Sequence, residues 1–145
     1  MGFAMYALTV TDQPDPAASA AIDDALLAHI RTHAGELTKT PLLVVVRDET
    51  GQFIGGLDGA TYFGWLYVEN LAVAEHQRGQ GVGSRLLRAA EAEAMHRGCT
   101  HAYLDTFSFQ ARPFYEKHGY TLAGTLEEFP AGHSRFFLQK RLGSQ

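Results

Sequence analysis

A glycine-rich segment near the middle of the chain, Gln77–Ser84 (QRGQGVGS), most strongly restricts what this sequence can form. Its three glycines at alternate positions leave little side-chain bulk around the backbone, and the apolar pattern after them predicts a helix. Successive N–H groups can then converge on one point at the positive end of that helix, an arrangement that holds a phosphate or pyrophosphate. The alternative is a flexible turn that only starts the helix.

The glycine spacing differs from two better-known phosphate-binding loops. A Walker A loop ends in Gly-Lys-Ser/Thr, whereas Gly83 is followed directly by Ser84 with no lysine. The dinucleotide fingerprint is G-x-G-x-x-G close to the first strand of a chain, whereas this segment has G-x-G-x-G and follows several predicted strands. Neither a nucleoside triphosphatase nor a dinucleotide-binding enzyme is therefore predicted.

Apolar periodicity and turn residues predict an alternating series of strands and helices. Helices are expected from Asp15-Pro16 to Gly35, from Val82 to Gly98, and over Ala111–His118. Strands are expected over Phe3–Val10, from Pro41 through LLVVV, from Gln52, and over Gly64–Val73, Thr100–Phe107, Tyr120–Leu126 and Ser134–Leu142. Many strands with few helices indicate a mostly antiparallel sheet, and the central strand–helix–strand unit adds one parallel pair.

Composition limits the class of protein. The 145 residues fit one domain, 1–145, and no apolar run reaches the roughly 20 residues that cross a bilayer. The N-terminus lacks the pattern of a signal peptide, and a single cysteine, Cys99, forms no internal disulfide, so a cytoplasmic location is expected. The net charge is −4 and no Lys/Arg cluster is present, which argues against nucleic acid and favours a cationic small molecule.

Two motifs make the chain resemble the GCN5-related N-acetyltransferases (GNAT). Arg78-x-x-Gly81-x-Gly83 matches the Q/R-x-x-G-x-G/A signature of that family, and ARPFYEKHGY, residues 111–120, is similar to its A-x-x-F-Y-E-K-x-G-[FY] box. The order of predicted elements agrees over nearly the whole chain. The resemblance implies a single-domain α/β GNAT fold, with a mixed, mostly antiparallel sheet, a central parallel strand pair and flanking helices.

The resemblance also implies a binding site for acetyl-CoA, used as a co-substrate. Backbone amides of the loop would hold the pyrophosphate, and the end of the preceding strand would pair with the pantetheine arm. The implied cofactor-binding residues are Leu71, Ala72, Val73, Arg78, Gly79, Gln80, Gly81, Val82, Gly83, Ser84 and Ser108. Ser108 stands where the family often has an asparagine that contacts the pantetheine, and Gln110 is the alternative donor for that contact.

Tyr115 and Glu69 are the candidate catalytic residues. Tyr115 occupies the position of a family tyrosine that protonates the departing thiolate, and a phenol stays protonated at neutral pH. Glu69 lies two residues before the strand segment that lines the acetyl group, where relatives place a general base. The alternatives are a core tyrosine and a carboxylate in a structural salt bridge.

The acceptor site is predicted less specifically, and three residues are candidates for it. Asp105 would hold an amine or serve as the base, Trp65 would form an aromatic wall for a cation, and His133 would close the site from the C-terminal hairpin. The seven histidines show no pair at metal-ligand spacing, so no metal is expected. The identity of the amine, the choice of base and a homodimer stay open.

The sequence therefore predicts an enzyme that transfers an acetyl group from acetyl-CoA to a primary amine, with a small molecule as the acceptor, by direct attack in a ternary complex. Two alternatives remain at this point. One is an N-acetyltransferase that acts on proteins or peptides, and the other is a non-catalytic module that binds acyl-CoA for regulation.

Overall fold

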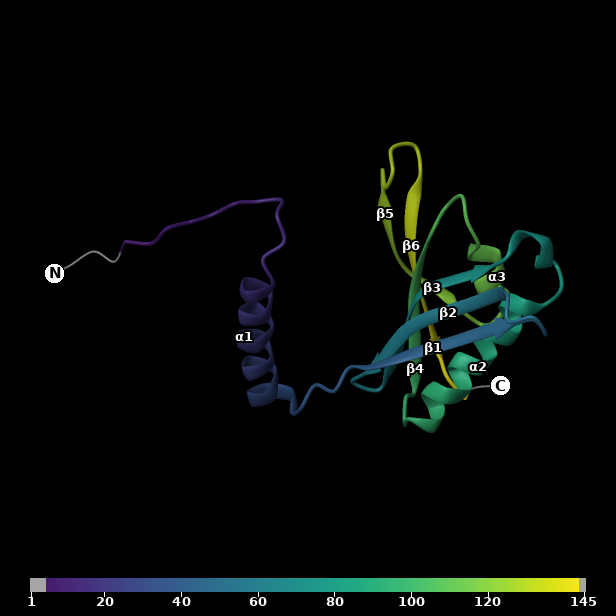
Figure 1. Cartoon of the computed structure of the whole chain (residues 1–145), viewed down its shortest axis with the longest axis horizontal. Coiled ribbons are helices and arrows are strands. Elements are labelled where there is room, and N and C mark those ends of the chain that lie inside the picture. The colour runs from purple at the N-terminus through teal and green to yellow at the C-terminus, as the bar shows by residue number, and fades with distance from the viewer. Residues whose placement is uncertain (1–4, 144–145) are drawn as a thin grey trace. The chain divides into compact units, whose positions relative to one another are not determined.

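The computed structural model describes residues 5–143, and they form two compact units divided between Leu37 and Thr38. The first unit contains one helix, α1, Pro16–Ala34, and the second contains the sheet and all other helices (Figure 1). The single domain predicted over 1–145 stays a prediction.

Helix α1 begins and ends where its sequence indicates. The side chain of Asp15 accepts a hydrogen bond from the N–H of Ala18 at 3.0 Å, Pro16 takes the first helical position, and Gly35 follows the last residue with φ +82°. A capping carboxylate and a proline at this position both favour helix initiation. This prediction is confirmed.

The strand predicted over Phe3–Val10 is wrong for the part that is described. Residues 5–10 form no strand, and the side chains of Met5, Tyr6, Leu8 and Val10 are exposed. Residues 3 and 4 lie outside the described residues. Alternating apolar side chains favour an extended backbone, but a strand also needs a neighbour to receive its hydrogen bonds, and residues 5–10 have none among the described residues.

The second unit is built on a six-stranded sheet with the order β1-β2-β3-β4-β6-β5. The strands are β1 (Thr40–Arg47), β2 (Phe53–Tyr62), β3 (Trp65–Val73), β4 (His101–Phe107), β5 (Thr121–Glu127) and β6 (Ser134–Arg141). All neighbours are antiparallel except β3 and β4, which run parallel. The predicted mixed sheet with one parallel pair is confirmed.

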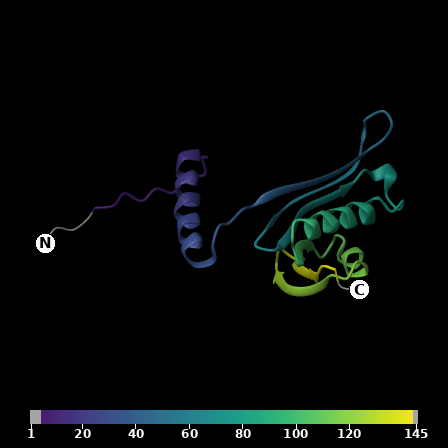
Figure 2. The ribbon, with the colours of Figure 1, turned by 90° about the horizontal axis from the view of Figure 1, so that it is seen from below.

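Helix α2, Val82–His96, covers one face of this sheet (Figure 2). The predicted apolar positions Val82, Leu86, Ala90 and Ala94 are all buried, and they pack with Leu57, Leu66, Leu104 and Leu138 from the strands. The short 3-10 helix η1, Glu75–Gln77, precedes it, and α3, Arg112–Lys117, follows β4. Cys99 is buried, as a small apolar residue would be, and burial raises the pKa of its thiol.

A buried polar network ties α2 to the C-terminal strands. The hydroxyl of Tyr120 donates to Glu91 Oε2 at 2.7 Å, and Lys140 Nζ lies 2.9 Å from Glu91 Oε1. Glu91 is only 6% exposed, so its charge needs both partners. This network holds the start of β5 and the end of β6 against the helix that follows the glycine loop.

Candidate active site

A cleft opens where the parallel strands β3 and β4 separate. Their residues pair only from Trp65↔His101 to Val68↔Leu104. Beyond that point β3 pairs only with β2, through to Val73↔Gly55, and β4 pairs only with β6. The far half of β3 therefore has one edge without a neighbouring strand.

A β-bulge at Glu69 marks the start of this unpaired half. Val68 pairs with Gly59 and Asn70 with Asp58, so Glu69 is an extra residue with no partner on β2. A bulge bends its strand and redirects the side chains after it. Before Glu69 the buried positions are Leu66 and Val68, whereas after it Leu71 and Val73 pack against the core.

The first part of the cleft, the cofactor cleft, has a volume of about 700 Å³. It contains nine of the eleven predicted cofactor-binding residues, all except Gln80 and Ser108. Its walls are Leu71, Ala72, Val73, Gln77, Arg78, Gly79, Gly81, Val82, Gly83, Ser84, Gln110, Ala111 and Phe114. Gln77, Ala111 and Phe114 were missed, although all three lie within or beside the two motifs.

The glycine loop presents backbone donors to this cleft. Gly81 is the N-cap of α2 with φ +81°, a conformation that favours glycine, and no side chain caps the helix. The first N–H groups of a helix have no partner within it, so they are free to bind an anion. A Cβ at Gly79 or Gly81 would meet no atom within 4 Å, which leaves open space for a ligand beside the loop.

The unpaired edge of β3 offers backbone hydrogen-bonding groups to the cleft. The N–H of Ala74 bonds to the carbonyl of Ile54 on β2 at 2.8 Å. Successive N–H groups alternate between the two edges of a strand, so those of Leu71 and Val73 point to the other edge, into the cleft. An extended chain with amide groups, such as pantetheine, could pair with this edge.

Gln110 lies on the opposite wall of the same cleft. Its Oε1 accepts the N–H of Phe107 at 3.2 Å, which leaves the side-chain NH₂ as a donor. Ser108 is engaged elsewhere, because its hydroxyl accepts the N–H of Ser134 at 3.0 Å, and it lines neither part of the cleft. The alternative donor named from the sequence, Gln110, lines the cofactor cleft, and its contact with the pantetheine stays a prediction.

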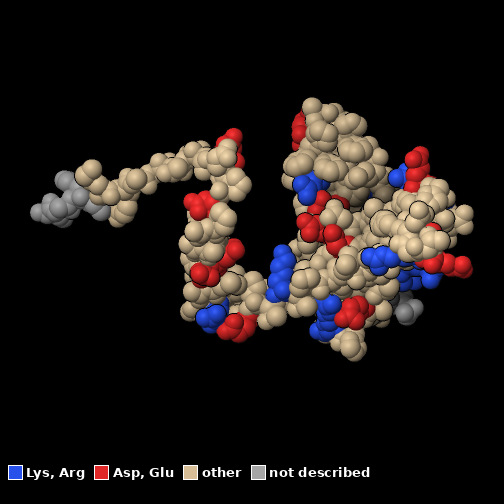
Figure 3. Space-filling view, in the orientation of Figure 1, with Lys and Arg blue, Asp and Glu red and all other residues tan. Residues whose placement is uncertain are grey.

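The second part, the acceptor cleft, has a volume of about 460 Å³ and joins the first at Leu71, Ala72, Gln110 and Ala111. Its other walls are Tyr67, Glu69, Asn70, Asp105, Thr106, Phe107, Tyr115 and Arg135. The structure thus brings together Glu69, Asp105 and Tyr115, which the sequence singled out separately. Figure 3 shows acidic side chains in the hollow beside the β5–β6 hairpin.

The charges in the acceptor cleft are unequal. Asp105 Oδ1 lies 2.7 Å from Arg135 Nη2 and accepts a hydrogen bond from Arg135 Nε at 2.8 Å, so these two charges largely cancel. Glu69 is exposed and forms no ion pair within the part of the chain that the structure describes. A negative charge therefore remains in the cleft and favours a cation.

Tyr115 is held rigidly and its hydroxyl reaches the cleft. The side chain is 7% exposed, and its ring packs edge-on against Phe114 and Tyr120 at centroid distances of 5.1 and 5.9 Å. The hydroxyl forms no hydrogen bond to any described residue. Every fully buried polar side-chain atom among these residues has a partner, so this hydroxyl is not fully buried, and it opens onto the cleft that Tyr115 lines. Burial, and then the charge of Asp105, raise the pKa of Tyr115.

Of the aromatic residues on β3, Tyr67 lines the acceptor cleft and Trp65 does not. Its ring stacks on Tyr103 at 4.8 Å, and the hydroxyl of Tyr103 is hydrogen-bonded to that of Tyr62. Burial, followed by the charges of Asp105 and Glu69, raises the pKa of Tyr67. Tyr67 alternates with Trp65 and Glu69 in the sequence, and this spacing could have indicated that Tyr67 belongs to the acceptor site.

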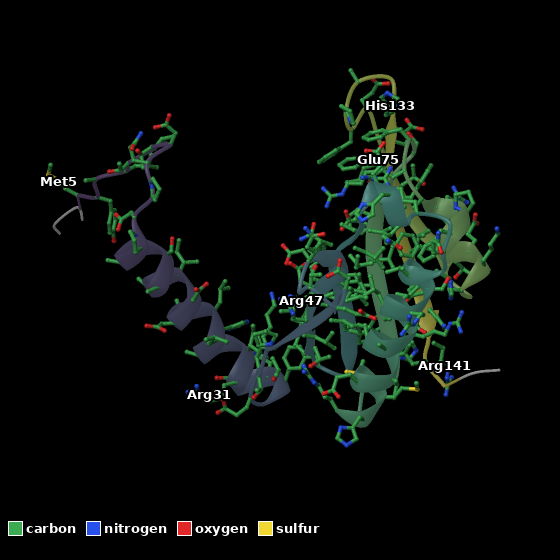
Figure 4. The ribbon with its side chains drawn as sticks, turned by 45° about the vertical axis from the view of Figure 1, so that its right-hand side comes forward. Met5, Arg31, Arg47, Glu75, His133 and Arg141 are labelled. Atoms are coloured by element: carbon green, nitrogen blue, oxygen red, sulfur yellow. The ribbon has the colours of Figure 1, made fainter. Side chains whose placement is uncertain are left out.

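Two of the predicted acceptor residues lie away from the cleft walls. Trp65 begins β3, at the end where the strands are still paired, and stacks on His101 at 4.6 Å. His133 lies at the tip of the β5–β6 hairpin and contacts the edge of Phe109 at 5.1 Å (Figure 4). Their roles toward an acceptor stay predictions.

No group of three or more His, Cys, Asp or Glu side chains among residues 5–143 is placed to hold a metal ion. Over the same residues, every helix is too short or too polar to cross a membrane.

Comparison with known proteins gives consistent matches. Residues 4–120 match the model of the acetyltransferase (GNAT) family. An acetyltransferase of Agrobacterium fabrum is 42% identical over 132 residues, which cover 91% of this chain and 96% of that one. A blasticidin-S acetyltransferase of Streptomyces morookaense is 41% identical over 95 residues, 65% of this chain and 70% of the relative.

The crystal structure of an acetyltransferase from Agrobacterium tumefaciens has a TM-score of 0.87 and 40% identity, and the match covers 94% of this chain and all of that one. A glycine loop at a helix N-terminus, an unpaired strand edge and an adjoining acidic cleft are the parts of a transferase that takes its group from a coenzyme A ester. The chain belongs to the GNAT acetyltransferase family. It is an acetyltransferase that uses acetyl-CoA.

Proposed function

We propose that this acetyltransferase acts on a primary amine of a small, cationic molecule. The observation that carries the proposal is the composition of the acceptor cleft. Glu69, which has no ion-pair partner among the described residues, lines this cleft together with Leu71 and Ala72, and these two residues also line the cofactor cleft. An ammonium ion would be attracted to this carboxylate, and the shared residues Leu71 and Ala72 would bring its nitrogen close to the acetyl group.

The size of the cleft supports a small acceptor. A volume of about 460 Å³ falls within the range of ordinary small-molecule pockets. Arg135 of β6 and Phe107 of β4 are among its walls, and side chains on two strands beside β3 would restrict the room for a peptide. A relative that is 41% identical carries the name blasticidin-S acetyltransferase, which is also consistent with a small acceptor.

We assign the proton transfers to two residues of this cleft. Acetyl-CoA supplies an activated acetyl group as a thioester. Glu69, directly or through a water molecule, takes the proton of the attacking amine, and Tyr115 donates a proton to the leaving sulfur. N–H groups at the unpaired edge of β3 stabilise the negative charge that develops on the acetyl oxygen.

The base has a limited task. An alkyl amine with a pKa near 10.4 is about 0.1% neutral at pH 7.4, which corresponds to a deficit of roughly 4 kcal/mol. An exposed carboxylate with access to water is sufficient for this purpose. Asp105 is less suited than Glu69, because its charge is already paired with Arg135.

The test is a thiol-release assay with acetyl-CoA and a panel of acceptors: polyamines, aminoglycosides, streptothricin-like antibiotics, blasticidin S, amino acids and lysine-containing peptides. We expect a small cationic amine to give the highest kcat/KM. Turnover with peptides alone would overturn the proposal in favour of a protein acetyltransferase. Binding of acetyl-CoA without release of thiol for any acceptor would favour a regulatory module.

A further inference from the structure

Three phenylalanines form an aromatic cluster, the aromatic rim, and one of them, Phe107, lines the acceptor cleft. Phe107 ends β4, Phe109 lies in the loop before α3, and Phe129 lies in the β5–β6 hairpin. The rings of Phe107 and Phe109 are stacked at 5.3 Å with an angle of 7° between their planes, and Phe129 lies 5.8 Å from Phe107. Segments some 20 residues apart in sequence thus contribute to one aromatic surface.

The aromatic rim is exposed rather than part of the core. Phe109 is 57% exposed and Phe129 is 41% exposed, and neither belongs to the core cluster around α2. A contiguous group of exposed apolar side chains, unlike single exposed ones, is a feature of binding surfaces. An internal role alone would not require two of the three rings to remain open.

The aromatic rim continues directly into the acceptor cleft. Phe107 and Arg135 both line that cleft. The guanidinium of Arg135 lies 4.9 Å from the ring centre of Phe129 and 5.6 Å from that of Phe107, while it also contacts Asp105 at 2.7 Å. One side chain therefore connects the carboxylate of Asp105 with the rim.

The two parts offer complementary chemistry to one ligand. Glu69 attracts an ammonium group, and the charge of Arg135 does not oppose this because Asp105 balances it. The exposed rings of Phe109 and Phe129 favour a flat ring as a partner, since aromatic pairs gain about 0.5–1.5 kcal/mol beyond the area that they bury. A saturated ring of the same size gains the hydrophobic part only.

We propose that the aromatic rim is a subsite for a planar aromatic or heteroaromatic ring of the acceptor, so that the acceptor class is an amine carried on a short chain from such a ring. This inference rests on the proposed function, because it assumes that the amine occupies the acceptor cleft near Glu69. It assigns Phe109 and Phe129 as residues that determine specificity.

The experiment measures binding rather than turnover, by calorimetry in the presence of saturating coenzyme A, which has no acetyl group to transfer. The probes are 2-phenylethylamine and 2-cyclohexylethylamine, which share charge and chain length and differ in the flatness of the ring. We expect the wild-type protein to bind the aromatic amine about threefold to tenfold more tightly. In Phe129→Leu and Phe109→Leu the ratio of the two Kd values should fall toward one.

A matched control is Phe53→Leu, because Phe53 is similarly exposed, at 49%, but lies on β2 outside the cleft. This variant should keep the wild-type ratio. A wild-type ratio near one, no binding of either amine, or a ratio that survives both rim substitutions would overturn the inference. So would a fall in the sedimentation mass of Phe129→Leu with an unchanged ratio, because the rim would then be a contact between two copies of the chain.

Failure of the inference and failure of the proposed function are distinguishable. If the predicted ratios are found but no amine of the acceptor panel is acetylated, the proposed function fails while the ring subsite stands. If small amines are acetylated and the ratio is one, the subsite fails and the proposed function stands.

Discussion

Gly59 and Tyr67 approach each other across β2 and β3 so closely that a side chain on Gly59 would overlap the carbonyl oxygen of Tyr67. This contact lies at the bulge, where Gly59 pairs with Val68 and Glu69 has no partner. The close approach of the two backbones is therefore part of what places Glu69 at the acceptor cleft.

Gly59→Ala should destabilise the protein by about 1–3 kcal/mol, because the new methyl group meets backbone that cannot rotate away. It should also lower kcat/KM at temperatures where the protein is still folded, since relief of the overlap would shift Tyr67 and Glu69. Gly56→Ala, on the same strand, is the control, because its Cβ would meet its nearest atom at an ordinary 3.4 Å. Equal melting temperatures for the two variants would contradict this account of the bulge.

Glu69→Gln should lower kcat/KM for an alkyl amine at neutral pH, and the loss should shrink as the pH rises. The physical reason is that the neutral fraction of the amine increases about tenfold per pH unit below its pKa, so a base becomes less necessary. The measurement is kcat/KM from pH 7 to 10 for both proteins. Glu75→Gln, at an exposed position in η1, controls for loss of charge alone. A loss that is constant over this pH range would argue against a role as base.

Gly81→Val should weaken binding of acetyl-CoA about tenfold to a hundredfold, because the valine disfavours φ +81° and the loop N–H groups lose their alignment. Gly64→Val is matched to it: Gly64 has φ +79° and open surroundings, but lies in the β2–β3 turn. Both variants should lose similar stability, and only Gly81→Val should lose affinity in a titration with acetyl-CoA. Equal affinities would show that the loop does not hold the pyrophosphate.

Tyr115→Phe should reduce kcat about 10²–10⁴-fold and leave the Kd of acetyl-CoA nearly unchanged. The substitution removes only the hydroxyl oxygen, and the sulfur that this hydroxyl would protonate develops its charge only in the transition state. Burial raises the pKa of Tyr115 above its ordinary value of 10.0, so its hydroxyl stays protonated at neutral pH. Deprotonation of Tyr115 should therefore not lower the wild-type kcat until the pH exceeds about 10. A variant with a lower melting temperature but normal turnover per folded molecule would indicate a structural tyrosine only.

Tyr120→Phe tests the buried network through alkaline stability. Burial and the charge of Glu91 raise the pKa of Tyr120 in the folded protein, so above pH 10 the unfolded chain releases a proton that the folded one keeps. The free energy of unfolding should then fall by about 1.4 kcal/mol per pH unit for this group, a loss that is absent below pH 10. Denaturant titrations at pH 8 to 11 should show a shallower decline in the variant, and identical slopes would contradict the shift.

Several features followed from short stretches of sequence because their causes are local. Asp15 and Pro16 start α1 through contacts within four residues, and the apolar spacing of α2 places its buried face without reference to any other element. The cofactor loop is local for the same reason, since its donors are consecutive backbone N–H groups. The family resemblance that this loop helps to carry therefore indicated nine of the residues that line the cofactor cleft.

Other features required partners that are distant in sequence. The predicted strand over Phe3–Val10 depended on a neighbour that the described residues do not provide. Ser108 and Gln110 are equally polar, and only the bond from the Ser134 N–H to Ser108 shows which of them is left to face the cofactor cleft.

The sequence alone determined the family motifs, the helices and the six strands after residue 38, because propensity, capping and hydrophobic period act over a few residues. Only the tertiary structure decided the acceptor cleft. The bulge at Glu69 depends on how β3 pairs with β2, and Asp105 gains its Arg135 partner through the register of β4 with β6. Such pairings join residues separated by 9 to 30 positions, and their geometry is set by the packing of the whole sheet on α2.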